Sequence, residues 1–247
     1  MRAGSLPLVV LVLVTMVGTT AAAPLQMDTR FRAVQPGEVV RLTITTGDPL
    51  DTMHVRAFGQ DIPVARLSPV VWEALIGIDL DVMPGAYEVS VEATAPGQHH
   101  ASRLRLDVTA RRFRTRRLTV ADGFVNPSPD AMARIEADAA DLDLVWTMSA
   151  PERYWTGPFG RPVTARPNSA FGTRSIFNGE PRQPHGGADF PSPTGTPIAA
   201  PGGGRVVLVR DLYFTGQTVV LDHGLGLYSL FAHLSRSEEH TSELQSH

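Results

Sequence analysis

The 247-residue sequence contains no cysteine and no lysine. Without cysteine the chain has no disulfide, no thiolate nucleophile and no cysteine-type zinc site, so any metal must be held by histidine and carboxylate. All 22 basic residues are arginine, which we interpret as a coding bias of GC-rich DNA. With 25 acidic residues the net charge is −3, and this balance gives no indication of a nucleic-acid partner.

Residues 1–23 have the pattern of a secretory signal peptide. Arg2 provides a positive start, residues 6–17 are apolar, and residues 20–23 are small enough for a cleavage site. The apolar run is short for a bilayer span, so we expect no stable membrane anchor after cleavage, with an uncleaved anchor as the alternative. The lack of cysteine excludes a lipoprotein anchor. We therefore expect an exported protein of the periplasm or cell envelope.

Residues 24–110 follow a period of two, which predicts half-buried strands. Apolar residues alternate with polar ones in the runs at 40–45, 87–93 and 104–108, and Pro-Gly pairs mark turns between them. This pattern predicts an immunoglobulin-like β-sandwich. His99-His100 is not expected to bind metal, because adjacent strand residues face opposite ways, and we interpret it as a solvated turn.

Residues 111–154 read as a linker that contains one helix. Five arginines, at 111, 112, 114, 116 and 117, indicate a solvated strand, or a contact with an anionic envelope polymer or lipid headgroups. Ser128-Pro129-Asp130 has the chemistry of a helix start. Apolar residues at helical spacing follow, and they predict a helix that braces the two halves of the chain: Met132, Ile135, Ala139, Leu142 and Val145.

The candidate site is the segment Pro184-His185-Gly186-Gly187-Ala188-Asp189-Phe190. Imidazole and carboxylate are both ligands for Zn²⁺, and an even spacing places His185 and Asp189 on one face of an extended strand. The small residues between them leave space for an open coordination position. The alternative is an ordinary hydrogen-bonded surface pair.

Three further β-type runs follow, at residues 205–209, 217–221 and 227–232. The whole succession resembles the lysostaphin/LytM-type zinc metalloendopeptidases, from about Trp155 to Ser235. His185, Gly187 and Asp189 match the H-x-G-x-D motif of that family, and Phe231-Ala232-His233-Leu234-Ser235 resembles its Y-x-H-L-S motif.

The resemblance implies a compact antiparallel β domain that cleaves the peptide cross-links of bacterial peptidoglycan with Zn²⁺. It implies that His185 and Asp189 are metal ligands and that His233 is a catalytic histidine outside the metal's first shell. His223, in Asp222-His223-Gly224, is interpreted as a structural residue at a strand end. No H-E-x-x-H motif occurs, so a glutamate base on that helix is excluded.

The family's later H-x-H motif, which supplies a third zinc ligand and a second catalytic histidine, does not occur in the sequence. Residues 236–247 resemble a translated sequencing adapter, so we expect a C-terminally truncated peptidase domain followed by an artefact. The predicted organisation is a signal peptide at 1–23, a sandwich at 24–110, a linker at 111–154, a truncated zinc peptidase domain at 155–235 and an artificial tail at 236–247.

The expected fold class is mainly β: an N-terminal immunoglobulin-like sandwich, a short helical linker and an incomplete antiparallel β peptidase domain. The expected function is zinc-dependent hydrolysis of peptidoglycan cross-links, with the peptide stems as partner. Because the sequence as written lacks the H-x-H motif, we expect this exact chain to be a poor enzyme. One alternative is a non-catalytic envelope protein that binds the wall or activates a hydrolase, and another is a metal-free periplasmic binding or structural protein. The oligomeric state does not follow from the sequence.

Overall fold

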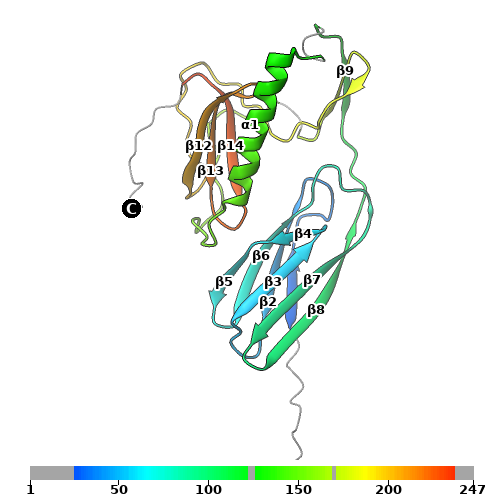
Figure 1. The fold of residues 1–247 in the computed structure, drawn as a ribbon, viewed down its shortest axis with the longest axis vertical. Helices are drawn as coiled ribbons and strands as arrows, with labels where there is room; N and C mark the ends of the chain where they lie inside the picture. Colours follow the sequence, from blue (N-terminus) through cyan, green and yellow to red (C-terminus); the bar gives the residue numbers. More distant parts are fainter. Residues whose placement is uncertain (1–24, 122–125, 169–170, 237–247) are drawn as a thin grey trace, which may run out of the picture.

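The structure is a computed structural model that describes residues 25–121, 126–168 and 171–236 (Figure 1). The described chain is mainly β, as predicted, with one helix among the described residues. The expected signal peptide at 1–23 lies outside the described residues, and so do residues 237–247 of the adapter-like tail.

The N-terminal half forms a sandwich of two antiparallel four-stranded sheets. The first has the order β1-β2-β6-β5, with β1 at Gln26–Arg30, β2 at Val39–Thr45, β5 at Val64–Ser68 and β6 at Val71–Gly77. The second has the order β4-β3-β7-β8, with β3 at Thr52–Ala57, β4 at Gln60–Ile62, β7 at Gly85–Ala95 and β8 at Gln98–Val108. With β4 as an extra edge strand, this is the ABED and CFG arrangement of immunoglobulin domains, which confirms the predicted sandwich.

The predicted alternation places one face of each strand in a shared core. Val40, Leu42 and Ile44 on β2 are completely buried, and they pack in one cluster with Val89 and Val91 of β7 from the other sheet. Burying each such side chain stabilises the fold by about 1.5–3 kcal/mol. The alternation in the sequence therefore identifies the face of each strand that forms the core.

The sequence pattern did not reveal strand β6, and it gave the wrong local structure at His99-His100. β6 is hidden in the sequence because Glu73 interrupts an apolar run; the carboxylate is buried, and it pairs with Arg153 at 3.2 Å and Arg41 at 3.8 Å. The expected solvated turn at His99-His100 is wrong. Both histidines belong to β8, and His100 is buried, because the turn is made by the preceding Pro96-Gly97.

The helix begins where the sequence predicts. α1 spans Pro129–Thr147, and the Ser128 side chain accepts a hydrogen bond from the Ala131 N–H at 3.3 Å. This cap, the proline at the first turn and Asp130 near the positive end of the helix explain why the chain turns helical here. Within the described ranges, no helix is long and apolar enough to cross a membrane.

The expectation that α1 braces the two halves is wrong, because α1 lies along the C-terminal sheet (Figure 1). Val145 is buried there, and its carbonyl accepts a hydrogen bond from the Tyr228 hydroxyl at 3.0 Å. Arg134 pairs with Asp211 of the adjacent strand at 3.0 Å. Of the predicted apolar stripe, Met132 is exposed, so the helix buries its C-terminal part more than its start.

The C-terminal half contains two small sheets. One is antiparallel with the order β12-β13-β14, formed by β12 at Arg205–Leu212, β13 at Gly216–Asp222 and β14 at Tyr228–Leu234. The other has the order β11-β10-β9, formed by β9 at Thr115–Leu118, β10 at Arg174–Phe177 and β11 at Glu180–Pro181. The strand pairs formed within residues 155–235 are antiparallel, as expected, and β9, from the segment read as a linker, adds to β10 in parallel.

A tight turn joins β10 to β11. Asn178 and Gly179 both have positive φ, 50° and 95°, as the two-residue turn of a hairpin requires. The Asn178 side chain also exchanges two hydrogen bonds with the main chain of Val120, at 2.9 and 3.0 Å. The arginine segment read as a linker in the sequence is thus tied to the C-terminal half.

Among the described residues, ion pairs connect the two halves of the chain. Arg153, which follows α1, reaches Glu73 of β6, and Arg174 of β10 pairs with Asp81 at 3.2 Å. Near the second contact, Glu38 accepts hydrogen bonds from Arg32 at 2.5 Å and from Arg111 at 3.0 Å. The hydrogen bond from Arg32 is the main cause that lowers the pKa of Glu38, with the charges of both arginines adding to it and burial opposing it.

We expect Glu38→Gln to lower the free energy of unfolding at pH 7 by about 2 kcal/mol, because it removes charge-assisted hydrogen bonds from two arginines. A lowered pKa means that this stabilisation is present above the ordinary value of 4.5 and is lost as the pH falls through the folded-state pKa. Urea unfolding at pH 7 and at lower pH measures both effects. The exposed Glu92→Gln is the control, and equal losses in both variants would contradict the prediction.

Candidate metal centre

His185 and Asp189 meet in the structure: His185 Nε2 lies 3.2 Å from Asp189 Oδ1. The extended strand predicted for this segment is wrong, since residues 182–190 form a loop with a bend at Gly187. In a strand, residues four apart are separated by about 13 Å, which no imidazole and carboxylate can bridge directly. The bend is therefore what brings the two side chains together.

Glycines and main-chain hydrogen bonds shape this loop. A Cβ added at Gly186 or Gly187 would meet nothing within 4 Å, so there is open space at both glycines. The His185 N–H donates to the Thr173 carbonyl at 3.0 Å, and the His185 carbonyl accepts from the Gly172 N–H at 2.8 Å. The chain before β10 thus holds His185 from both sides.

The donor set of the pair fits a zinc ion. Two donors that each lie about 2.0–2.1 Å from a tetrahedral ion are roughly 3.3 Å from each other, close to the 3.2 Å between His185 Nε2 and Asp189 Oδ1. The His185 side chain is 32% exposed and that of Asp189 is 62% exposed, so an ion from solvent can reach them. Among the described residues, no group of three or more His, Cys, Asp or Glu side chains could hold a metal.

His233 lies on β14 with an exposed side chain. The pairing of β13 with β14 shifts register between Gln217 and Val219, and His233 adopts a φ of +56° in this irregular part of the strand. Its N–H donates to the Thr215 carbonyl at 2.8 Å. A positive φ is uncommon outside glycine, although histidine is among the residues that adopt it more often, and a β-bulge re-aims the side chain it carries.

His223 has the opposite environment. It is completely buried, its Nδ1 lies 2.6 Å from the Gly203 carbonyl, and its Nε2 lies 2.8 Å from the Ser229 hydroxyl. Because a carbonyl can only accept, Nδ1 carries the proton and Nε2 accepts from Ser229. Phe159 packs edge-on against the ring at 4.7 Å. Both nitrogens are occupied, so the geometry agrees with a structural role and leaves no ring nitrogen for a metal.

Asp222 is a buried residue whose importance sequence reasoning missed. Its side chain accepts hydrogen bonds from the Ser149 hydroxyl at 3.0 Å, the Ala150 N–H at 2.9 Å and the Gly224 N–H at 2.7 Å. One carboxylate therefore joins the end of α1, the end of β13 and the turn after it. The Asp222-His223-Gly224 triplet was visible in the sequence, but two of the groups that contact Asp222, in Ser149 and Ala150, lie more than 70 residues away.

The fold and the pair together define a mainly β protein with an accessible histidine–carboxylate site of metal-ligand type. Comparison with known proteins makes this more specific. The sequence profile of peptidase family M23 matches residues 183–244, which include His185, Asp189 and His233. This match supports the resemblance to the LytM-type peptidases that the motifs of the C-terminal segment predicted.

Individual relatives support this resemblance. The peptidoglycan DD-endopeptidases ShyA and ShyB of Vibrio cholerae serotype O1 are 42% and 34% identical over 53 residues. Each match covers 22% of this chain and 12% of the relative. A crystal structure described as a candidate M23 peptidase from Pseudomonas aeruginosa is 29% identical with a TM-score of 0.60, over 83% of this chain and 75% of that chain.

We expect Asp222→Ala to lower the free energy of unfolding by about 3 kcal/mol or more, since it leaves buried N–H donors without an acceptor. The exposed His233→Ala should change it by no more than about 0.5 kcal/mol. Urea unfolding of the two variants and the unaltered chain measures this. A small effect of Asp222→Ala would show that the carboxylate does not hold these elements together.

Proposed function

We propose that this protein is a zinc-dependent endopeptidase that hydrolyses peptide cross-links of bacterial peptidoglycan. The observation that carries the proposal is the contact of His185 with Asp189 inside the segment matched by family M23. The names of the two Vibrio cholerae relatives support peptidoglycan as the substrate. The two relatives match this chain over 53 residues, so peptidoglycan is proposed as the substrate of the whole protein on the basis of a short segment.

His185 and Asp189 are the residues that would hold the zinc ion. When bound, zinc polarises the scissile carbonyl and lowers the pKa of a water molecule to about 7. The imidazole of His233, exposed on β14, would donate a hydrogen bond to the oxyanion or carry a proton to the leaving amine. Asp222 and His223 would act through packing, because they hold β13 and the following turn in place.

The proposed function also predicts where the protein is located in the cell and how its domains are divided. A wall-cleaving enzyme works outside the cytoplasm, which agrees with the signal-like residues 1–23 and an envelope location. Residues 24–110 would form a separate sandwich domain and residues 155–235 the peptidase domain, with the peptide stems of the wall as partner. β9 and α1 pack with the C-terminal strands, so the segment at 111–154 would act with the peptidase domain.

A second candidate function is a non-catalytic envelope protein that binds the wall or activates a hydrolase. One observation favours it: within the described ranges, His185 and Asp189 are not joined by a third metal-ligating side chain. A site with two protein ligands holds zinc weakly, and structural and catalytic zinc sites use three or four. The two candidates differ in whether peptide bonds are cut.

We expect the purified protein with zinc to release peptide fragments from peptidoglycan, and a chelator to abolish this until zinc is restored. His233→Ala should reduce the rate about 100- to 10,000-fold, as expected for loss of a proton-transfer group, while wall binding in a sedimentation assay is kept. The exposed His99→Ala is the matched control and should cleave normally. Wall binding without any release of fragments would reject the peptidase and favour the non-catalytic protein.

A further inference from the structure

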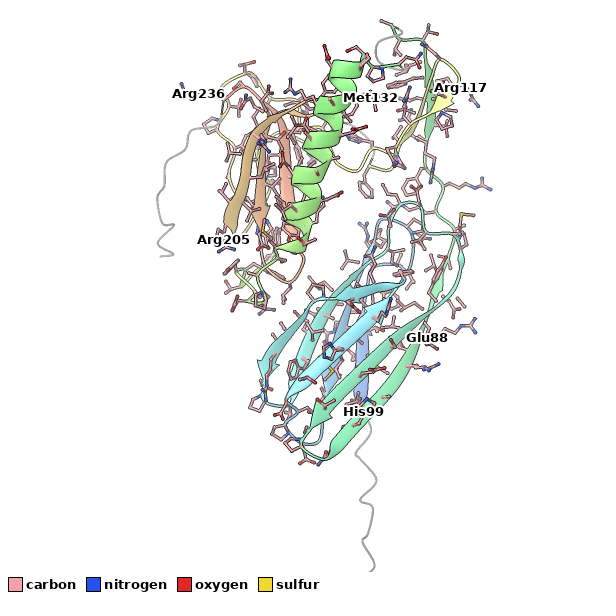
Figure 2. All side chains as sticks on the ribbon, viewed as in Figure 1. Glu88, His99, Arg117, Met132, Arg205 and Arg236 are labelled. Atoms are coloured by element: carbon pink, nitrogen blue, oxygen red, sulfur yellow. The ribbon has the colours of Figure 1, made fainter. Side chains whose placement is uncertain are left out.

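β9 and the residues just before it carry positive charge that no described carboxylate neutralises. Arg112, Arg114, Arg116 and Arg117 are all exposed, and none forms an ion pair with a described carboxylate. The neighbouring Arg111 and Arg174 do pair, with Glu38 and Asp81. Figure 2 shows Arg117 on β9, on the other side of α1 from Arg205. Two of these four arginines lie on β9 and two lie in the residues just before it, so unpaired charge gathers in and beside this strand.

Hydrogen bonds anchor the chain before and after β9. Arg111, four residues before the strand, donates to Glu38 at 3.0 Å and to the Pro36 carbonyl at 3.1 Å. Asn178 fixes its end through two hydrogen bonds to Val120. Arginines on a strand fixed in this way lose little conformational freedom when a ligand binds.

One of these arginines is already oriented. Arg116 donates from Nε to the hydroxyl of Ser175, at 2.8 Å, and Ser175 is buried. The two terminal nitrogens of Arg116 make no protein hydrogen bond among the described residues, so they can receive a carboxylate in bidentate geometry. By strand alternation, Arg114 projects to the same face two residues earlier.

β9 is also an edge strand, so one side of its main chain is open to a further strand. Its other side reaches the candidate metal centre across a single strand. The Arg174 N–H donates to the Arg114 carbonyl at 2.8 Å, and the adjacent Thr173 carbonyl accepts from the His185 N–H. Two strand spacings, about 10 Å, thus separate the main chains of Arg114 and His185. A peptide added to the open edge of β9 lies one spacing further out, about 15 Å from the main chain of His185, and four or five residues of an extended peptide span that distance.

We propose that β9 docks a carboxylate-bearing peptide stem of the cell wall, with Arg116 and Arg114 binding its free carboxylates. The inference rests on the proposed peptidase function and adds a specificity-determining surface to it. An extended peptide can add to the open edge through main-chain hydrogen bonds, while the guanidinium groups select acidic stems.

Two other roles of these arginines would require different properties of the side chains. Charge on an edge strand also prevents edge-to-edge aggregation, but that role does not require an oriented guanidinium such as that of Arg116, whose Nε donates to Ser175. Anionic lipid headgroups would attract the strand through net charge, without need of a planar fork. The fixed Nε of Arg116 and the short path to His185 both favour the acidic peptide.

The test uses the full chain and two synthetic stem peptides, one with free carboxylates and one with the carboxylates amidated. We expect the acidic peptide to bind at least about tenfold more tightly than the amidated one. Arg116→Gln and Arg116→Lys should each remove most of that preference, and Arg114→Gln, which leaves the Ser175 hydrogen bond intact, should weaken it as well. Arg205→Gln, at an exposed strand arginine without an ion pair, is the matched control and should keep it.

The outcomes separate this inference from the proposed function. Equal binding of both peptides by the unaltered chain overturns the inference, even if peptidoglycan is still cleaved. So does an Arg116→Lys variant that keeps the full preference, because charge alone would then suffice. Loss of binding to phosphatidylglycerol vesicles in Arg116→Gln, with peptide binding unchanged, would assign β9 to a membrane surface instead. Absence of cleavage with the preference intact rejects the peptidase and leaves the docking strand in place.

Discussion

The main-chain hydrogen bonds of residues 172–175 are the constraint on which the candidate site depends. On one side they hold the loop that carries His185, and on the other they hold β9, whose Arg114 carbonyl accepts from Arg174. The Arg174 side chain, in turn, reaches Asp81 of the sandwich. A few residues before and within β10 therefore fix three things at once: the metal-type pair, the arginine strand and one contact between the two halves of the chain.

The C-terminal sheet has its own anchor in Asp222. Because this buried carboxylate accepts from the end of α1 and from the turn after β13, the helix, the sheet and the turn are held as one unit. The two histidines nearby illustrate how environment separates roles. His223 has both ring nitrogens bonded inside the protein, whereas His233 is exposed on a strand of irregular register. Only the second has a ring free to meet a substrate in the way the proposed chemistry requires.

Local patterns in the sequence were enough to predict the sandwich strands β2, β7 and β8, the start of α1 and the family that the C-terminal segment resembles. Features that depend on distant partners were not predictable. β6 was hidden because Glu73 is buried by Arg153, which lies 80 residues away, and the parallel pairing of β9 joins residues almost 60 apart. The motif identified His185 and Asp189, but a regular strand would have kept their side chains apart. They meet because the chain bends at Gly187. That bend uses the backbone freedom of glycine, and the spacing of the two residues does not predict it.

The central claim is that His185 and Asp189 hold a zinc ion, and zinc K-edge absorption of the zinc-loaded protein tests it most directly. Because the chain has no cysteine, the account predicts nitrogen and oxygen ligands at about 2.0–2.1 Å with imidazole scattering. It also predicts that the bound zinc is lost in His185→Ala and in Asp189→Ala, but not in His99→Ala. A protein that holds no zinc, or one whose spectrum is unchanged in the first two variants, would contradict the account.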